Sequence, residues 1–102
     1  MEMIKLIIVL AEISFKENIT NEIIEGAQKL IEASLTEKGC IDYKLYSPVG
    51  KDNSLLFVEK WEEKSYLEIH LKQPHFINFH TSFGNLFEKT EISAYSSEKI
   101  EL

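Results

Sequence analysis

The sequence of 102 residues has no arginine, a single cysteine and only two prolines. With Cys40 alone, no disulfide can form within the chain, which is typical of a reducing compartment and leads us to expect a cytoplasmic protein. All eleven basic residues are lysines, and the net charge is −6. Nucleic-acid interfaces and anionic membrane surfaces attract basic segments, and arginine is the usual reader of bases. We therefore expect no nucleic acid and no membrane among the partners.

Long apolar runs and the common metal and phosphate motifs are also missing. The apolar run at 6–11 is too short to cross a membrane, and Glu12 follows it directly, unlike the cleavage site of a signal peptide. The sequence has no C-x-x-C, no H-E-x-x-H and no glycine-rich phosphate loop. Its composition, 44% hydrophobic and 27% charged, is that of an ordinary globular domain. We expect residues 1–102 to form one domain without a bound metal.

What the sequence does contain is clear apolar periodicity. Residues 3–13 form a nearly continuous apolar run, typical of a buried strand. Residues 19–37 repeat apolar side chains at helical spacing, with Asn18 as the predicted N-cap and Gly39 just past the end. The remaining predicted elements are a hairpin of strands 40–47 and 55–61, a helix at 63–72, a further helix from Pro74 whose apolar stripe reaches Phe87, and an edge strand at 91–100.

The order of these elements, β-α-β-β-α-β, predicts an α+β fold of the ferredoxin-like type, with four antiparallel strands and helices on one face of the sheet. Alternation along strand 55–61 places Leu56 and Val58 on one face and Phe57 and Trp61 on the other. We expect Phe57 and Trp61 to be left on the face that the helices do not cover. Because exposed apolar patches mark partner surfaces, we predict a homodimer that packs sheet against sheet, with an apolar pocket beside each sheet.

One segment of the chain, EKWEEKSYLEIHLKQPHF at 59–76, resembles the signature of the antibiotic biosynthesis monooxygenase family, which combines E-x-W, a helix ending in H-L, and P-H-F. GCIDY at 39–43 and AEI at 11–13 also match, so the resemblance covers nearly the whole chain. It implies a dimeric α/β barrel with a site between the sheet and the second helix. Members oxidise quinols or polyketide hydroquinones with O₂ without flavin or metal, degrade haem, or bind and isomerise small carbonyl compounds.

Two histidines, His70 and His75, are the predicted catalytic residues. An imidazole near neutral pH can remove the proton of a phenol, and the electron-rich phenolate can then pass an electron to O₂. The alternative roles are structural. His70 would brace the break between the two helices, and His75 would satisfy backbone groups near Pro74.

Aromatic side chains are predicted to form the walls of the substrate cavity. These are Phe57, Trp61, Phe79 and Phe83. The alternative role of Phe57 and Trp61 is in the dimer core. Hydroquinone-oxidising relatives carry an asparagine where Phe57 stands, so their mechanism does not transfer residue by residue.

Three polar residues complete the predicted substrate-binding set. Burial of Glu59 would raise its pKa and make it a base, or its carboxylate would pair with a lysine across the dimer. Tyr66 would donate a hydrogen bond to a substrate oxygen or lie half-exposed. His80 resembles in position the proximal iron ligand of haem-degrading relatives. The first strand lacks the asparagine of those relatives, so we do not expect haem.

The function that we favour from the sequence is that of a cofactor-independent monooxygenase. Its partners would be O₂ and a quinol or a similar electron-rich phenol. One alternative is a dimeric barrel that binds a small hydrophobic molecule without catalysis. The other is a haem-binding or haem-degrading protein with His80 as the iron ligand.

Overall fold

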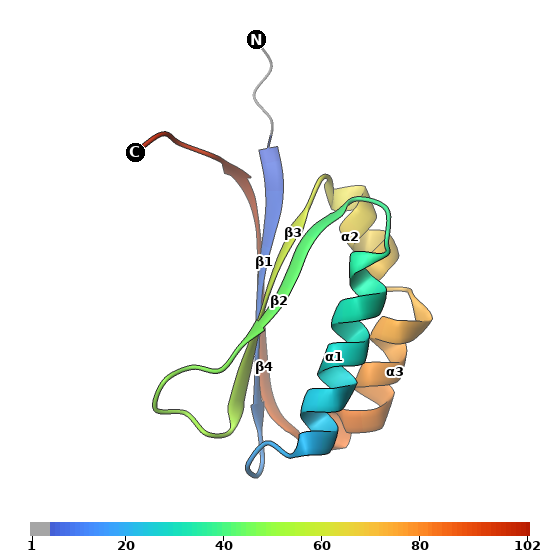
Figure 1. Cartoon of the computed structure of the whole chain (residues 1–102), viewed down its shortest axis with the longest axis vertical. Coiled ribbons are helices and arrows are strands. Elements are labelled where there is room, and N and C mark those ends of the chain that lie inside the picture. Colours follow the sequence, from blue (N-terminus) through green and yellow to red (C-terminus); the bar gives the residue numbers. More distant parts are fainter. Residues whose placement is uncertain (1–4) are drawn as a thin grey trace.

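The computed structural model describes residues 5–102 as a four-stranded antiparallel sheet with the helices layered on one of its faces (Figure 1). Its elements in chain order are β1 (Lys5–Phe15), α1 (Asn21–Leu35), β2 (Cys40–Tyr46), β3 (Ser54–Trp61), α2 (Lys64–His70), α3 (Pro74–Phe83), a 3₁₀ turn (Gly84–Leu86) and β4 (Phe87–Glu98). The strand order across the sheet is β2-β3-β1-β4. The predicted ferredoxin-like fold is therefore confirmed. Residues 3 and 4 of the predicted first strand lie outside the described residues.

The first helix begins later than the sequence predicted. Thr20, and not Asn18, is the N-cap of α1, and its Oγ1 accepts a hydrogen bond from the backbone N–H of Ile23 at 3.3 Å. A hydroxyl in this position satisfies one of the free N–H groups of the first turn. After the helix, Gly39 has a φ of 86°, and a side chain there would collide with the ring of Tyr66. Glycine is thus required where the chain turns into β2.

The break in the second helix lies where Pro74 predicts it. Gln73 is extended, with φ −74° and ψ 146°, and Pro74 is the first residue of α3. The end of α3 differs from the prediction, because the helix stops at Phe83 and Phe87 already belongs to β4. Phe87 pairs with Phe15 in the sheet, and their rings meet edge to face at 5.3 Å. Phe87, which was predicted to extend the helical stripe, is thus a strand residue.

The helices cover the face of the sheet that was predicted to be open. Phe57 and Trp61 are 3% and 0% exposed, and they lie under the helices on the same face as Ala11 and Ile7, their partners in β1. The prediction that they face water was wrong. Alternation along one strand separates its two sets of side chains, but it does not say which set the helices bury. The larger aromatic set is buried, since its burial removes more apolar surface from water.

The opposite face of the sheet has no covering layer within the described chain (Figure 1). It carries the side chains that alternate with the buried set, and several of them are apolar or aromatic: Ile8, Leu10, Tyr46, Leu56, Val58 and Tyr95. Leu10 is 38% exposed and Tyr95 is 54% exposed. Among residues 5–102, no helix is both long enough and apolar enough to cross a membrane.

Candidate functional site

An apolar cavity of about 170 Å³ lies between the sheet and helices α2 and α3. All four strands form its floor and one side, through Val9, Ala11, Ile13, Tyr43, Phe57, Glu59, Thr90, Ile92 and Ala94. The helices close the other side with Leu30, Leu67, Leu71, Phe76 and His80. Because nearly all of the lining is apolar, the few polar side chains determine how a ligand would be oriented.

Glu59 is the acidic group of this cavity. Its side chain comes from the middle of β3, is buried, and accepts a hydrogen bond at Oε1 from the indole Nε1–H of Trp61 at 3.0 Å. Burial raises the pKa of Glu59 from 4.5 to about 7, although the hydrogen bond from Trp61 lowers it. The charge of Glu37 adds to the rise in pKa. Near neutral pH, Glu59 can therefore both accept and donate a proton.

His80 is the histidine that lines the cavity. Its Nδ1–H donates to the backbone carbonyl of Phe76 at 3.0 Å, so Nε2 is the ring nitrogen that this contact leaves open to a ligand. The ring lies between aromatic neighbours, with ring centroids 4.3 Å from Phe76 and 5.7 Å from Phe87. Packing on both sides fixes its orientation.

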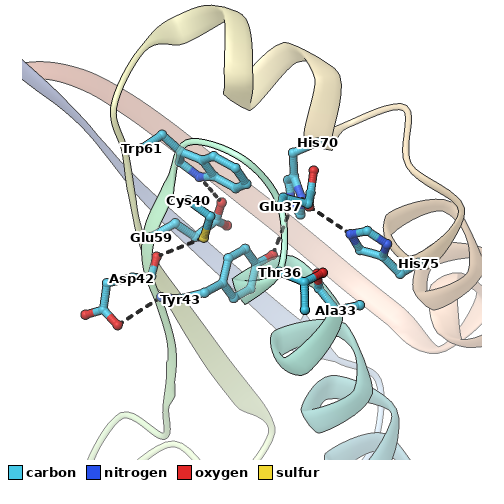
Figure 2. Close-up of polar contacts among 10 residues, drawn as sticks. All are labelled: Ala33, Thr36, Glu37, Cys40, Asp42, Tyr43, Glu59, Trp61, His70 and His75. Atoms are coloured by element: carbon cyan, nitrogen blue, oxygen red, sulfur yellow. Dashed lines mark hydrogen bonds and ion pairs between the residues drawn. The ribbon is translucent and has the colours of Figure 1, made fainter.

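The two predicted catalytic histidines lie outside the cavity lining, where both of them bind Glu37 (Figure 2). Fully buried His70 donates from Nδ1 to Glu37 Oε2 at 2.5 Å, and its Nε2 accepts from the hydroxyl of Tyr43 at 3.3 Å. His75 donates from Nε2 to the same Glu37 oxygen at 2.8 Å. Burial lowers the pKa of His70, and the hydrogen bond to Glu37 opposes this shift. Neither imidazole lines the cavity, so neither would touch a ligand bound there.

Glu37, which follows α1, and Tyr43 of β2 are the residues that the sequence did not identify. Glu37 is separated from His70 by 33 residues and from His75 by 38. Residue spacing within one helix or strand cannot predict a contact between residues so far apart in the sequence. Tyr43 appeared in the sequence only as part of the G-C-x-x-Y match, whereas in the structure it lines the cavity and also binds His70.

The predicted aromatic walls are only partly present. Phe57 lines the cavity. Phe79 lies behind it, outside the lining, and the two rings meet edge to face with their centroids 5.9 Å apart. Trp61 binds Glu59 without lining the cavity. Phe83 packs beside Gly26 of α1 and belongs to a separate groove between α1 and α3. Tyr66 lies half-buried against Gly39, outside the cavity.

The cluster of Glu37, His70 and His75 has the donor types of a metal site, with its ligand atoms within 4.8 Å of one another. Bonds of about 2.1 Å from nitrogen or oxygen to zinc would place neighbouring ligand atoms about 3 Å or more apart. The contacts of 2.5 and 2.8 Å to the Glu37 oxygen are shorter than this separation and have the length of charge-assisted hydrogen bonds. The geometry is that of a hydrogen-bonded cluster.

The fold and the cavity define a ferredoxin-like domain with an apolar cavity beneath helices α2 and α3. The family model described as "Antibiotic biosynthesis monooxygenase" matches residues 6–82. The chain therefore belongs to the antibiotic biosynthesis monooxygenase family, as the sequence signature predicted.

Individual relatives agree with this assignment. An uncharacterized protein from Synechocystis is 37% identical over 90 residues, which are 87% of this chain and 61% of that protein, so the chain spans less than two thirds of that relative. The Bacillus subtilis protein named "Putative monooxygenase YcnE" is 31% identical over 74 residues, 72% of this chain and 78% of that protein. The crystal structure of a conserved protein from Methanosarcina mazei is similar with a TM-score of 0.83 and 30% identity, over 90% of this chain and 92% of the other.

Proposed function

We propose that this protein is a cofactor-independent monooxygenase that oxidises a small quinol or a similar electron-rich phenol with O₂. The observation that carries the proposal is the Glu59 carboxyl, which faces a largely apolar cavity and has a pKa of about 7. A general base is most effective when its pKa lies near the working pH. Family membership supports chemistry of the monooxygenase type.

In the proposed reaction, Glu59 accepts the proton of the phenol. The resulting phenolate is electron-rich enough to donate an electron to O₂, which is the difficult step in the absence of a cofactor. One oxygen atom is then inserted into the ring and the other is released as water, so that a quinol and O₂ give a hydroxyquinone and H₂O. His80 Nε2 would accept a hydrogen bond from the second hydroxyl of the quinol, and the apolar lining would exclude water.

This assignment moves the base from the predicted His70 or His75 to Glu59. The two histidines bind Glu37 and lie outside the cavity lining, so they would act on a ligand only through other residues. The cavity volume of about 170 Å³ favours a ligand of one or two rings. Drug-sized ligands fill about 300–1,000 Å³, so haem, which is no smaller, is disfavoured as the ligand of His80.

Oxygen consumption with a panel of reduced benzoquinols and naphthoquinols, corrected for autoxidation, tests this function. We expect uptake that depends on the wild-type protein and falls at least about 100-fold in Glu59→Gln, because positioned proton transfer contributes about 10²–10⁴-fold. Glu62→Gln, which changes an exposed glutamate near the same strand, is the matched control and should retain the rate. Uptake by the wild type that equals autoxidation with every quinol would contradict the proposal.

A second candidate function is the sequestration of a small hydrophobic molecule without catalysis. The nearly complete apolar lining favours it, because such a ligand needs no base. In that case a bound aromatic molecule would have the same affinity for the wild type and for Glu59→Gln, and neither protein would consume O₂. Isothermal titration with one- and two-ring phenols separates the two functions.

We also propose that two copies associate through the open face of the sheet. This face carries Ile8, Leu10, Leu56, Val58 and Tyr95 without a covering layer in the described chain. Large exposed apolar patches are uncommon on monomers. Sedimentation equilibrium of the wild type and Val58→Lys tests this association, and a monomeric wild type at micromolar concentration would contradict it.

A further inference from the structure

Trp61 is the hydrogen-bond donor to the proposed base, although it does not line the cavity (Figure 2). Its indole Nε1–H donates to Glu59 Oε1 at 3.0 Å. Because residues two apart in a strand point to the same face, β3 brings both side chains beneath the helices. Trp61 is 0% exposed and Glu59 is 4% exposed, so water has little access to this contact.

The indole ring is held in place by its neighbours in the sheet and in the core. Trp61 pairs with Ile7 of β1 on one side and with Cys40 of β2 on the other. Its ring meets the Tyr43 ring edge to face, with the centroids 6.4 Å apart, and lies tilted against the His70 ring at 4.8 Å. A buried ring packed in this way has little room to rotate, so its N–H stays directed at the carboxyl.

The chemistry of the two groups decides which carboxyl oxygen can exchange a proton. An indole N–H can only donate, whereas a carboxyl oxygen without a proton accepts. The contact therefore uses Oε1 as the acceptor in both ionisation states of Glu59. The proton of the neutral acid then belongs on Oε2, which is the oxygen that this contact leaves open to a ligand. The carboxyl keeps one orientation as it gains and loses the proton, and such preorganisation lowers the cost of proton transfer.

We propose that Trp61 is a positioning residue, which holds Oε1 of Glu59 so that Oε2 exchanges the proton with a ligand in the cavity. The hydrogen bond is a feature of the fold, and its use in turnover rests on the proposed function. In that reaction the O–H bond of the phenol breaks, an Oε2–H bond forms, and one proton moves. Burial raises the pKa of Glu59 and this hydrogen bond opposes the rise, so Trp61 also favours the form that accepts the proton.

Other ionisable groups near this pair enter the design of the test. Those that face Glu59 or share the cavity with it are Tyr43 and Cys40 of β2, Glu37 after α1, and His80 of α3. The indole itself lies against His70 of α2. A change in the charge of His70 would also move an indole signal, so the test has to separate two titrations.

The indole N–H resonance tests the position of Glu59 without any substrate. The chain has one tryptophan, so a proton–nitrogen correlation spectrum contains a single indole signal. We expect its proton to shift downfield as the pH rises through about 7, because a hydrogen bond to a carboxylate is stronger than one to a neutral acid. This step should vanish in Glu59→Gln and persist in the control Glu62→Gln. A step from His70, whose pKa burial lowers, would lie below pH 6.5 and remain in both variants.

Oxygen uptake with the quinol panel tests the role of the contact in turnover. Benzothienylalanine in place of Trp61 keeps the size of the ring and removes the N–H, and the single tryptophan makes this replacement specific. We expect kcat to fall about 10- to 100-fold with little change in KM, because the ring does not touch the ligand and a misplaced base is costly. The pH of half-maximal uptake should rise. Phe15→Leu, which alters a core side chain at the other end of β1, is the control and should keep the wild-type pH profile.

An indole resonance without the step near pH 7, or with the same step in Glu59→Gln, would overturn the proposal. A protein with benzothienylalanine that keeps the wild-type kcat and pH profile would also overturn it. If that protein does not fold, the resonances of the wild type and Glu59→Gln decide alone. A wild type that shows the step but consumes no O₂ with any quinol would refute the proposed function, and the positioning of Glu59 by Trp61 would stand.

Discussion

Glu37 and Glu59 are the same chemical group in two contrasting surroundings. Glu37 accepts hydrogen bonds from two imidazoles and joins the end of α1 to the junction of α2 and α3. Glu59 has an indole N–H as its hydrogen-bond donor and, among residues 5–102, no cation beside it, so that burial raises its pKa to about 7. The comparison shows that the partners of a buried carboxyl decide whether it holds elements together or keeps a raised pKa.

The largest expected effect is the loss of stability on removing a hydrogen-bond partner of Glu37. His70→Ala should lower the free energy of unfolding by about 3–5 kcal/mol, because it leaves a cavity and removes a partner from both Glu37 and Tyr43. Urea denaturation of the wild type and the variant measures the loss. His80→Ala is the comparison variant and should cost less, since its ring is half-buried and binds one backbone carbonyl. Equal losses in the two variants would contradict this view of the cluster.

The raised pKa of Glu59 should make the free energy of unfolding depend on pH. Folding raises the pKa of Glu59 from 4.5 to about 7, so its neutral form favours the folded state. This contribution is present below pH 4.5 and is lost as the pH rises through 7, with a total of at most about 3 kcal/mol. Chemical denaturation at a series of pH values should show the loss in the wild type and not in Glu59→Gln.

His70 should make the stability change with pH in the opposite direction. Its pKa is lowered in the folded protein, so its contribution is lost as the pH falls through 6.5. In Glu59→Gln this slope should remain alone, and stability should rise as the pH increases toward neutrality. A variant whose stability still falls from pH 4.5 to pH 7 would show that a group other than Glu59 is responsible.

Cys40 lies near both glutamates and can report on them. Burial and the charges of Glu37 and Glu59 raise the pKa of its thiol to about 11. Because the thiolate is the reactive form, alkylation by iodoacetamide at pH 8 should be about 10- to 100-fold slower than for a free thiol. Glu59→Gln should accelerate it modestly. A rate in the native protein that equals the rate in urea would contradict the predicted environment.

The smallest effect is expected at the outer end of the Glu37 cluster. His75→Ala removes one charge-assisted hydrogen bond from a partly exposed side chain, so we expect a loss of about 1–2 kcal/mol in the free energy of unfolding. His75→Gln keeps a donor of similar reach and should recover part of this loss. Thermal and urea denaturation of both variants provide the measurement. A loss as large as that of His70→Ala would show that the two histidines contribute equally.

The sequence predicted the elements and the fold because these depend on local patterns. Apolar spacing indicated α1, Pro74 indicated the break between α2 and α3, and the signature at 59–76 indicated the family. The errors arose where tertiary contacts determine which face is buried or where an element ends. The buried face of β3 was assigned wrongly, and Phe87 was placed in a helix although its pairing with Phe15 makes it a strand residue.

The candidate site was less accessible to sequence reasoning. His70 and His75 were identified from the sequence. Glu37 was not, because it contacts them only in the folded chain, from 33 and 38 residues away. The position of Glu59 inside the cavity follows from the choice of buried face, which alternation alone does not determine. Their roles in catalysis stay predictions for the experiments above.

The strand order has a consequence for how such a protein could diversify. Thr90, Ile92 and Ala94 border the cavity from β4, an edge strand, whereas Glu59 and Tyr43 belong to β3 and β2 at the other side of the sheet. Ile92 is 57% exposed, so substitutions there disturb little packing. Under the proposed function, β4 would contribute to ligand shape and β2 and β3 would carry the proton chemistry. Mutation along β4 would then alter ligand preference and leave Glu59 and Tyr43 unchanged, which makes this edge a starting point for directed evolution.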